Sequence, residues 1–241
     1  SNYTKSVSGI PNIGGSLSLS QFRGKKPYSQ DYIYTTPGTY TFTVPQGCSN
    51  ICVLCVGGGC DGSIAHTNGI GQGGGGGALA YVNNIAVNPG SIFRINVGNR
   101  LSYNNYNGNY SGFSKSDGSG IKFYAYSANS QNGATFSFLM DNIVTTIPNS
   151  FGKNGNDGTD PSTVSPDLTN IYVYGGGGGG AAGYTTNDIG GSTFTPPDSF
   201  NGNFVGTGGG GIGIYGINSQ GENGNTNGNG GKYGGGGGGA Y

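Results

Sequence analysis

Four cysteines form the densest group of chemically reactive side chains in the sequence: Cys48, Cys52, Cys55 and Cys60. Cys52 and Cys55 have the C-x-x-C spacing of many zinc sites. In a strand, however, residues three apart point to opposite faces, so we do not expect these two thiols to bind one ion. The sequence favours small buried core residues at these positions. It leaves open one disulfide, between Cys48 and Cys60, or a metal site.

A second candidate site is the run Gly57–Gly62, which satisfies the G-x-G-x-x-G spacing directly after an expected strand. The dinucleotide fingerprint also needs a helix whose N-terminus faces the pyrophosphate. The following residues, Ser63–Gly69, have no helical periodicity. A second run, Gly230-Gly231-Lys232-Tyr233, lacks the Ser or Thr that follows Lys in a P-loop. We therefore expect no nucleotide cofactor.

Acid–base and calcium chemistry are poorly supported as well. His66 is the only histidine and Glu222 the only glutamate, and no pair of carboxylates stands out. The segment Asn154–Asp160 suggests a calcium loop, but Gly158 falls where a ligand is needed, so a polar turn is favoured. The sequence predicts a protein that is not an enzyme, with no catalytic residues, no metal and no cofactor.

Composition indicates an ordered protein with an uncharged surface. Glycine supplies 55 of 241 residues, and charged residues make up only 8%. Ten basic and ten acidic side chains balance, so nothing calls for nucleic acid or an anionic membrane. Hydrophobic residues still reach 32%, with 17 Tyr and 11 Phe, too many for a disordered linker. No apolar stretch is long enough to span a membrane.

Short apolar bursts bounded by Gly, Pro or Asn predict strands. They are Tyr40–Val44, Ile51–Val56, Ile92–Val97, Thr135–Met140 and Ile171–Tyr174. Within Ala134–Phe151, the longest stretch without glycine, the alternation of apolar residues predicts one strand and then a second β segment. Glycine elsewhere disfavours helix. We expect an all-β fold with essentially no α-helix.

Glycine runs recur at 57–59, 73–77, 175–180, 208–211 and 234–239, several of them followed by Ala and Tyr. As a three-residue-per-turn extended helix, six glycines reach about 19 Å. Without Cβ atoms such helices can approach closely and bond to one another. We therefore expect packed polyglycine II helices, with Gly75, Gly177, Gly210 and Gly236 as structural positions. The alternative is that the runs are flexible loops over a β-sandwich.

A tyrosine- and asparagine-rich segment is the candidate contact surface, through Tyr103, Asn104, Asn105, Tyr106 and Tyr110. This mixture gives rigid amphipathic contacts with adaptable hydrogen bonding, and it suits stacking on sugars. The alternative is a turn that packs on its own sheet. Asn2 and Asn109 begin N-x-S/T sequons, which matter only if the chain meets a glycosylation machinery.

The stretches Thr36–Gly47, Ile51–Gly59 and Gly73–Gly77 resemble the opening of glycine-rich proteins of phages and large DNA viruses. The polyglycine runs are similar to those of tail-fibre tip adhesins of T-even-like phages. A similar pattern occurs in the extracellular glycine-rich domain of anaplastic lymphoma kinase, whose flanking modules and membrane span we do not find here. Gly14–Gly24 resembles a short N-terminal segment of virion proteins.

These resemblances imply an N-terminal attachment segment, 1–29, and a glycine-rich β domain, 30–241. They imply a jelly-roll or TNF-like β-sandwich in a virion structural protein, a capsid-surface or tail-fibre component with a receptor-binding role. The expected partners are other virion subunits, in a homo-oligomer or assembly, and a host surface glycan or protein. The expected location is the virion. The alternative is a non-viral extracellular matrix or fibril-forming module.

Overall fold

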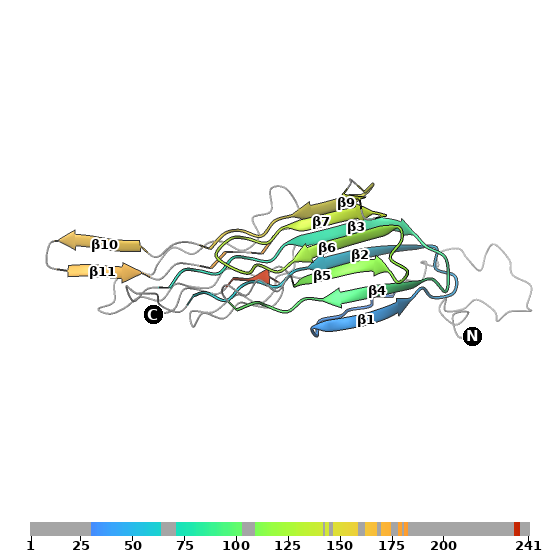
Figure 1. Cartoon of the computed structure of the whole chain (residues 1–241), viewed down its shortest axis with the longest axis horizontal. Coiled ribbons are helices and arrows are strands. Elements are labelled where there is room, and N and C mark those ends of the chain that lie inside the picture. The colour runs from blue at the N-terminus through green and yellow to red at the C-terminus, as the bar shows by residue number, and fades with distance from the viewer. Residues whose placement is uncertain are drawn as a thin grey trace, which may run out of the picture.

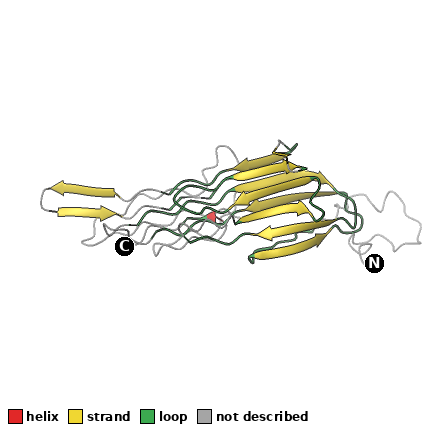
Figure 2. Ribbon diagram, in the orientation of Figure 1, coloured by secondary structure: helices red, strands yellow, loops and turns green. Residues whose placement is uncertain are grey.

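The computed structural model describes residues 30–63, 71–102, 109–141, 143–144, 147–158, 162–167, 170–174, 178–179, 181–182 and 234–236. Within these ranges the protein is all-β (Figure 1; Figure 2), as predicted. No α-helix occurs in this part of the chain. The expected attachment segment, 1–29, lies outside the described residues.

The larger sheet has six antiparallel strands in the order β1-β4-β5-β6-β7-β8. They are β1 (Gly38–Thr43), β4 (Ile92–Val97), β5 (Tyr110–Lys115), β6 (Ile121–Tyr126), β7 (Phe136–Met140) and β8 (Ile143–Val144). From β4 onward each strand pairs with its successor in the chain. Strand β1 joins at the edge, where Phe42 lies opposite Phe93.

The smaller sheet has the order β2-β3-β9, with β2 (Asn50–Val56), β3 (Leu79–Ala86) and β9 (Ser150–Lys153). A separate antiparallel hairpin consists of β10 (Ser162–Asp167) and β11 (Asn170–Tyr174). Extended segments separate this hairpin from the two sheets, and Figure 1 shows it at the far end of the molecule. The molecule is therefore elongated.

A row of phenylalanines crosses the inner face of the larger sheet. Phe93 stacks on Phe113 with ring centroids 4.6 Å apart. The row continues through Phe123 to Phe138, with centroids 5.6 Å and 5.8 Å apart. Phe113 and Phe123 are almost fully buried. Because each ring comes from a different strand, this row ties four strands to one core.

The two sheets share that core in a sandwich-like arrangement. Cys55 of β2 and Val82 and Ile85 of β3 belong to the same buried cluster as the phenylalanines. The jelly-roll or TNF-like topology stays a prediction. No helix among the described residues is long and apolar enough to cross a membrane.

All five apolar bursts form strands, namely β1, β2, β4, β7 and β11. The stretch Ala134–Phe151 contains β7 and the start of β9, as predicted, with the short β8 between them. Strands β3, β5, β6 and β10 were not predicted, because Asn, Gly, Ser or Lys interrupts their apolar residues.

Candidate functional site

Extended segments leave one end of the sandwich and lie side by side toward the β10–β11 hairpin (Figure 2). We call them the glycine array. It consists of residues 57–63, 72–78, 98–101, 127–134, 154–158, 178–179, 181–182 and 234–236. Backbone hydrogen bonds join its members, although none of these residues belongs to one of the strands β1 to β11.

Hydrogen bonds between segments 57–63 and 72–78 recur at every third residue. Gly57 N–H donates to Ala78 O at 2.8 Å, Cys60 N–H to Gly75 O at 2.9 Å, and Ser63 N–H to Gln72 O at 2.9 Å. The donor advances by three residues while the acceptor moves back by three. A β ladder has a period of two instead. The two segments are therefore antiparallel with a three-residue repeat.

Two further segment pairs have the same spacing. Gly179 N–H donates to Gly74 O at 2.8 Å and Ala182 N–H to Gly77 O at 3.0 Å, which makes these segments parallel. In an antiparallel pair, Gly155 N–H donates to Ala134 O at 2.9 Å. In that same pair, Gly158 N–H donates to Gln131 O at 2.7 Å. The three-residue repeat is thus independent of direction.

Segment 72–78 lies at the centre of the glycine array. Four consecutive N–H groups, Gly75 to Ala78, donate to four different acceptors: the carbonyl oxygens of Ser130, Asn156, Gly234 and Tyr126. An extended chain with three residues per turn directs successive N–H groups about 120° apart, so it can bond to neighbours on all sides. This segment is therefore enclosed by other backbones.

At Gly75 and Gly236 the neighbouring backbones lie too close to leave room for a side chain. A Cβ atom built at Gly75 would lie 2.2 Å from Asn132 O, and one at Gly236 would lie 2.1 Å from Gly74 O. Such contacts direct a glycine Cα–H toward a carbonyl oxygen. Of the four predicted structural glycines, Gly177 and Gly210 lie outside the described residues.

The G-x-G-x-x-G run has its amides engaged within the protein. Gly57 and Cys60 donate to segment 72–78, and Gly58 N–H donates to Ser127 Oγ at 2.9 Å. Asp61 N–H donates to Leu101 O at 2.8 Å. In a dinucleotide-binding fingerprint such N–H groups bind the pyrophosphate, and here they are already bonded within the protein.

The four thiols are free, and they differ in environment. Cys52 is exposed and Cys48 partly buried, whereas Cys55 and Cys60 are buried. Burial raises the pKa of Cys55 to about 12, and burial together with the Asp61 charge raises the pKa of Cys60 to about 12. The prediction of small core residues therefore fits Cys55 and Cys60 but not Cys52. The described residues contain no metal-binding cluster of His, Cys, Asp and Glu.

Residues 154–158, predicted as part of a polar turn, form an extended segment of the glycine array. The carboxylate of Asp157 accepts a hydrogen bond from Gly133 N–H at 2.7 Å. Beside it, Gln131 Nε2 donates to Gly158 O at 3.0 Å. Polar side chains here form hydrogen bonds with backbone groups of adjacent segments.

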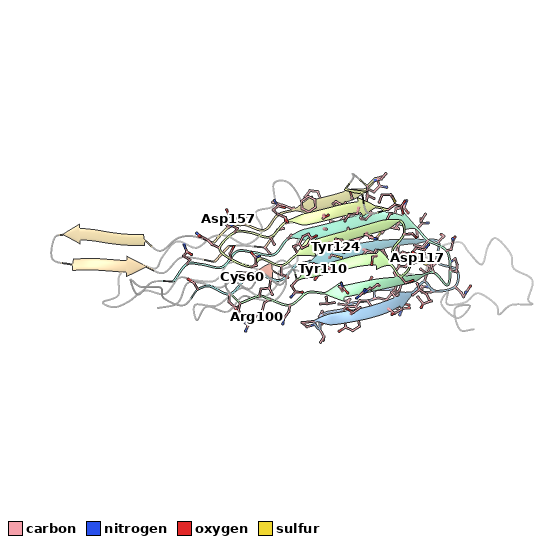
Figure 3. The ribbon with its side chains drawn as sticks, viewed as in Figure 1. Cys60, Arg100, Tyr110, Asp117, Tyr124 and Asp157 are labelled. Atoms are coloured by element: carbon pink, nitrogen blue, oxygen red, sulfur yellow. The ribbon has the colours of Figure 1, made fainter. Side chains whose placement is uncertain are left out.

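Three tyrosines cluster on the outer face of the larger sheet. Figure 3 labels two of them, Tyr110 and Tyr124, next to the glycine array. Tyr110 meets Tyr124 edge-to-face, with centroids 4.7 Å apart, and Tyr126 at 6.0 Å. The centroids of Tyr124 and Tyr126 are 6.2 Å apart. All three side chains are half-buried. Burial, and then the neighbouring Tyr110 and Tyr126, raise the pKa of Tyr124, while Arg94 lowers it.

Gly112 lies beneath the rings of this tyrosine cluster. It pairs with Tyr124 across the strands β5 and β6. A Cβ atom at Gly112 would lie 2.6 Å from Cδ1 of Tyr124 and 3.0 Å from Cδ2 of Tyr110. The absence of a side chain therefore lets both rings lie against the backbone of the sheet, as aromatic residues do over strand glycines.

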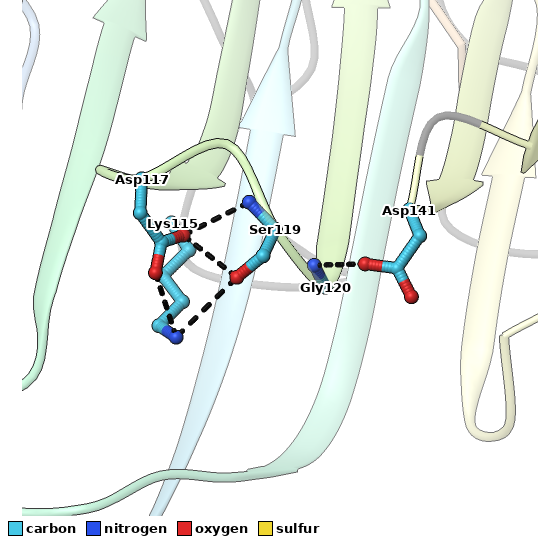
Figure 4. Close-up of polar contacts among 5 residues, drawn as sticks. All are labelled: Lys115, Asp117, Ser119, Gly120 and Asp141. Carbon is cyan, nitrogen blue, oxygen red and sulfur yellow. Dashed lines mark hydrogen bonds and ion pairs between the residues drawn. The ribbon is translucent and has the colours of Figure 1, made fainter.

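The hairpin between β5 and β6 carries a compact polar network (Figure 4). Asp117 Oδ1 accepts from Ser119 N–H at 2.9 Å and from Ser119 Oγ at 2.7 Å, and its Oδ2 lies 3.0 Å from Lys115 Nζ. These hydrogen bonds, those of Ser119 first, hold the pKa of Asp117 well below its usual range. Asp141 Oδ1 accepts from Gly120 N–H at 2.6 Å, which ties the hairpin to the end of β7.

Of the predicted contact residues, only Tyr110 is described, and it belongs to the tyrosine cluster. Tyr103, Asn104, Asn105 and Tyr106 lie outside the described residues, as do Asn2 and His66. The sequence prediction missed Tyr124 and Tyr126. Their signal was the alternation Lys122-Phe123-Tyr124-Ala125-Tyr126, which places the two tyrosines on one face of a strand.

Residues 35–241 match a family model described as a glycine-rich domain. Comparison with curated proteins and with solved structures returns no match.

Proposed function

The chain belongs to the glycine-rich domain family, and we propose that it is a non-enzymatic structural protein at the surface of a virus particle. In this role the sandwich is the base and the glycine array is a stiff projection, as in a tail fibre. The observation that carries the proposal is the three-residue hydrogen-bond repeat that joins the segments of the array.

We assign these segments to packed polyglycine II helices. Three residues per turn is the period of that helix, which makes no internal hydrogen bonds and must bond to its neighbours. The repeat at Gly57, Cys60 and Ser63 supports this assignment, and so does its occurrence in both parallel and antiparallel pairs. Backbone bonds enclosed by backbone make the projection rigid with only small apolar side chains, such as Ala78 and Ala134, buried within it, which suits an element that must extend outward.

The edges of the two sheets support association with other subunits. Strands β1 and β8 end the larger sheet, and β2 and β9 end the smaller one. Tyr32 and Ile33, just before β1, are 43% and 49% exposed. Edge strands with nearby apolar side chains favour pairing with another chain. We expect a homo-oligomer or an assembly in the particle.

Mass spectrometry of purified particles, with immunogold labelling by an antibody to the folded chain, tests the location. We expect the chain in the particle fraction and gold at its surface. Recovery only from an extracellular matrix or fibril would replace the viral role with the non-viral alternative. Light scattering of the purified chain tests association, and a monomer at high concentration with no partner in the particle would contradict it.

A further inference from the structure

The outer face of the larger sheet is a candidate binding surface, and binding there would deepen the proposed surface role, on which it rests. This face is defined by strand register, because directly opposed residues of antiparallel strands share a face. Gly112 lies opposite Asn96 and Tyr124, Ser114 lies opposite Arg94, and Tyr110 lies opposite Tyr126. The next strand adds Ser137, opposite Tyr124.

Tyr124 is the centre of this face. One side of its ring lies against Gly112, where no Cβ intervenes. Tyr110 supports it edge-on, with the ring planes at 65°. A ring fixed to the sheet in this way presents its other side outward at little entropic cost, since its rotamer is set by packing. The electron-rich face of an aromatic ring attracts the polarised C–H bonds of a sugar ring.

Hydrogen-bonding side chains surround this platform. The hydroxyls of Ser114 and Ser137 lie on the same face, on the two strands that flank the β6 strand of Tyr124. The amide of Asn96 lies on this face one strand further away, on β4 beyond Gly112. Asn96 is held by Thr39, whose Oγ1 donates to Asn96 Oδ1 at 2.9 Å. Small polar groups around an aromatic platform match the alternating hydroxyls and C–H faces of a pyranose.

Charge on this face has one sign. The outward positions of β1, β4, β5, β6 and β7 include Arg94 and Lys122 and no Asp or Glu. Lys122 is buried, whereas Arg94 is exposed. Arg94 is on β4 and Tyr124 on β6, two strand spacings apart, and Arg94 is also two residues along β4 from Asn96, the residue in line with Tyr124. About 12 Å therefore separates their backbones. An extended guanidinium can therefore reach an acidic group on a sugar stacked at Tyr124, and it pairs with a carboxylate through two parallel bonds.

A protein partner fits this face less well. On β1 and on β4 to β7, the large aliphatic side chains of this face are Ile92 and Leu139, at the end of the strands away from Tyr110 and Tyr126. A stable protein interface needs a buried apolar centre, and this face has threonine, serine, asparagine and glycine around its tyrosines instead. We propose that the outer face of the larger sheet binds a carboxylate-bearing glycan, with Tyr124 stacking on a pyranose ring and Arg94 pairing with the carboxylate.

Titration calorimetry of the full chain tests this with a panel of probes. The acidic probes are 3′-sialyllactose and a hyaluronan tetrasaccharide, and the neutral ones are lactose and cellotetraose. We expect at least one acidic probe to bind at least tenfold more tightly than the neutral ones, and less tightly as salt rises. Failure of both acidic probes to bind, or equal binding of the neutral ones, would overturn the inference.

Variants assign the binding to this face. Tyr124→Leu and Arg94→Gln should each weaken binding about tenfold or more, whereas Tyr124→Phe, which keeps the ring, should bind like the parent. Tyr34→Leu and Arg100→Gln are the matched controls, because Tyr34 packs on Tyr40 and Arg100 lies 3.7 Å from Asp61, both away from this face. Control variants that weaken binding as much would overturn the assignment.

Saturation-transfer NMR on the parent chain gives a second measure that does not depend on the variants folding. We expect transfer from tyrosine ring protons to the sugar ring. Transfer from aliphatic protons alone would contradict stacking. If the parent chain binds no glycan but self-associates, and Tyr124→Leu abolishes that self-association, the face binds a second copy of the chain instead. If the chain is found in particles but binds no acidic probe, the surface role remains supported and only the glycan inference is wrong.

Discussion

Cys60 and Gly75 are joined by a 2.9 Å hydrogen bond, from the N–H of the first to the carbonyl oxygen of the second. Their segments meet again three residues away in both directions, at Gly57 with Ala78 and at Ser63 with Gln72. A flexible glycine loop has no reason to repeat one contact at a fixed interval. The relationship therefore indicates an ordered array, whose amides should behave like those of a protein core.

Amide hydrogen exchange measures this order directly. Gly75, Gly76, Gly77 and Ala78 each donate to an enclosed carbonyl. We expect their exchange to be slower than in an unstructured peptide by about a thousandfold or more, since exchange requires the array to open. NMR or mass spectrometry on the native chain reports these rates. Exchange of the 73–77 run at peptide rates would show that the run is a loop.

Thiol reactivity should divide the cysteines by burial. With pKa values raised to about 12, Cys55 and Cys60 are thiolates in about one molecule in ten thousand at pH 8. We expect iodoacetamide to modify the exposed Cys52 first and to reach the buried pair only after denaturation. Peptide mapping after timed alkylation gives the order. Equal rates at Cys52 and Cys55 would contradict the described burial.

Strands with dense β-branched and aromatic residues could be predicted from sequence, as β1 and β4 were. Strand β5 could not, because Ser111, Gly112 and Ser114 dilute its apolar pattern, and its place depends on pairing with β4 and β6. The glycine runs indicated close packing. Their neighbours, however, include ordinary segments such as 154–158, which bond through backbone groups that every residue has.

The tyrosine cluster could be predicted only in part from the sequence, for a related reason. Tyr110 stands out in a tyrosine-rich stretch, whereas the place of Tyr124 in the cluster depends on Gly112 of the neighbouring strand, against which its ring lies. A cross-strand pair is set by register, and register is a property of the whole sheet.

Asp117 should titrate below the usual aspartate value of about 3.9, because Ser119 and Lys115 donate to its ionised form. A lowered folded-state pKa means that this network stabilises the protein above the unfolded pKa. That contribution is lost as pH falls through the folded pKa. Carbonyl ¹³C NMR titration should show the shift, and Ser119→Ala should move the pKa back toward 3.9. An unchanged pKa in Ser119→Ala would exclude Ser119 as its main cause.

Gly75→Ala tests whether close backbone packing holds the array together. The added Cβ would lie 2.2 Å from Asn132 O, a backbone atom that can withdraw only if the segments separate. Overpacking costs about 1–3 kcal/mol. Each hydrogen-bonding group left buried without its partner adds about 1–3 kcal/mol. We expect each of Gly75→Ala and Gly236→Ala to lower the free energy of unfolding by about 2–5 kcal/mol, which combines these two costs.

Gly90→Ala is the matched control for these variants. Gly90 has a φ of +82° and no atom within 4 Å of a built Cβ, so alanine there meets backbone strain without a steric contact. That strain costs about 1–2 kcal/mol, and Gly90→Asn should cost less because asparagine tolerates a positive φ. Urea denaturation of the four variants ranks them. If Gly75→Ala loses no more stability than Gly90→Ala, the glycines of segment 72–78 serve chain flexibility, and the packed-helix assignment is wrong.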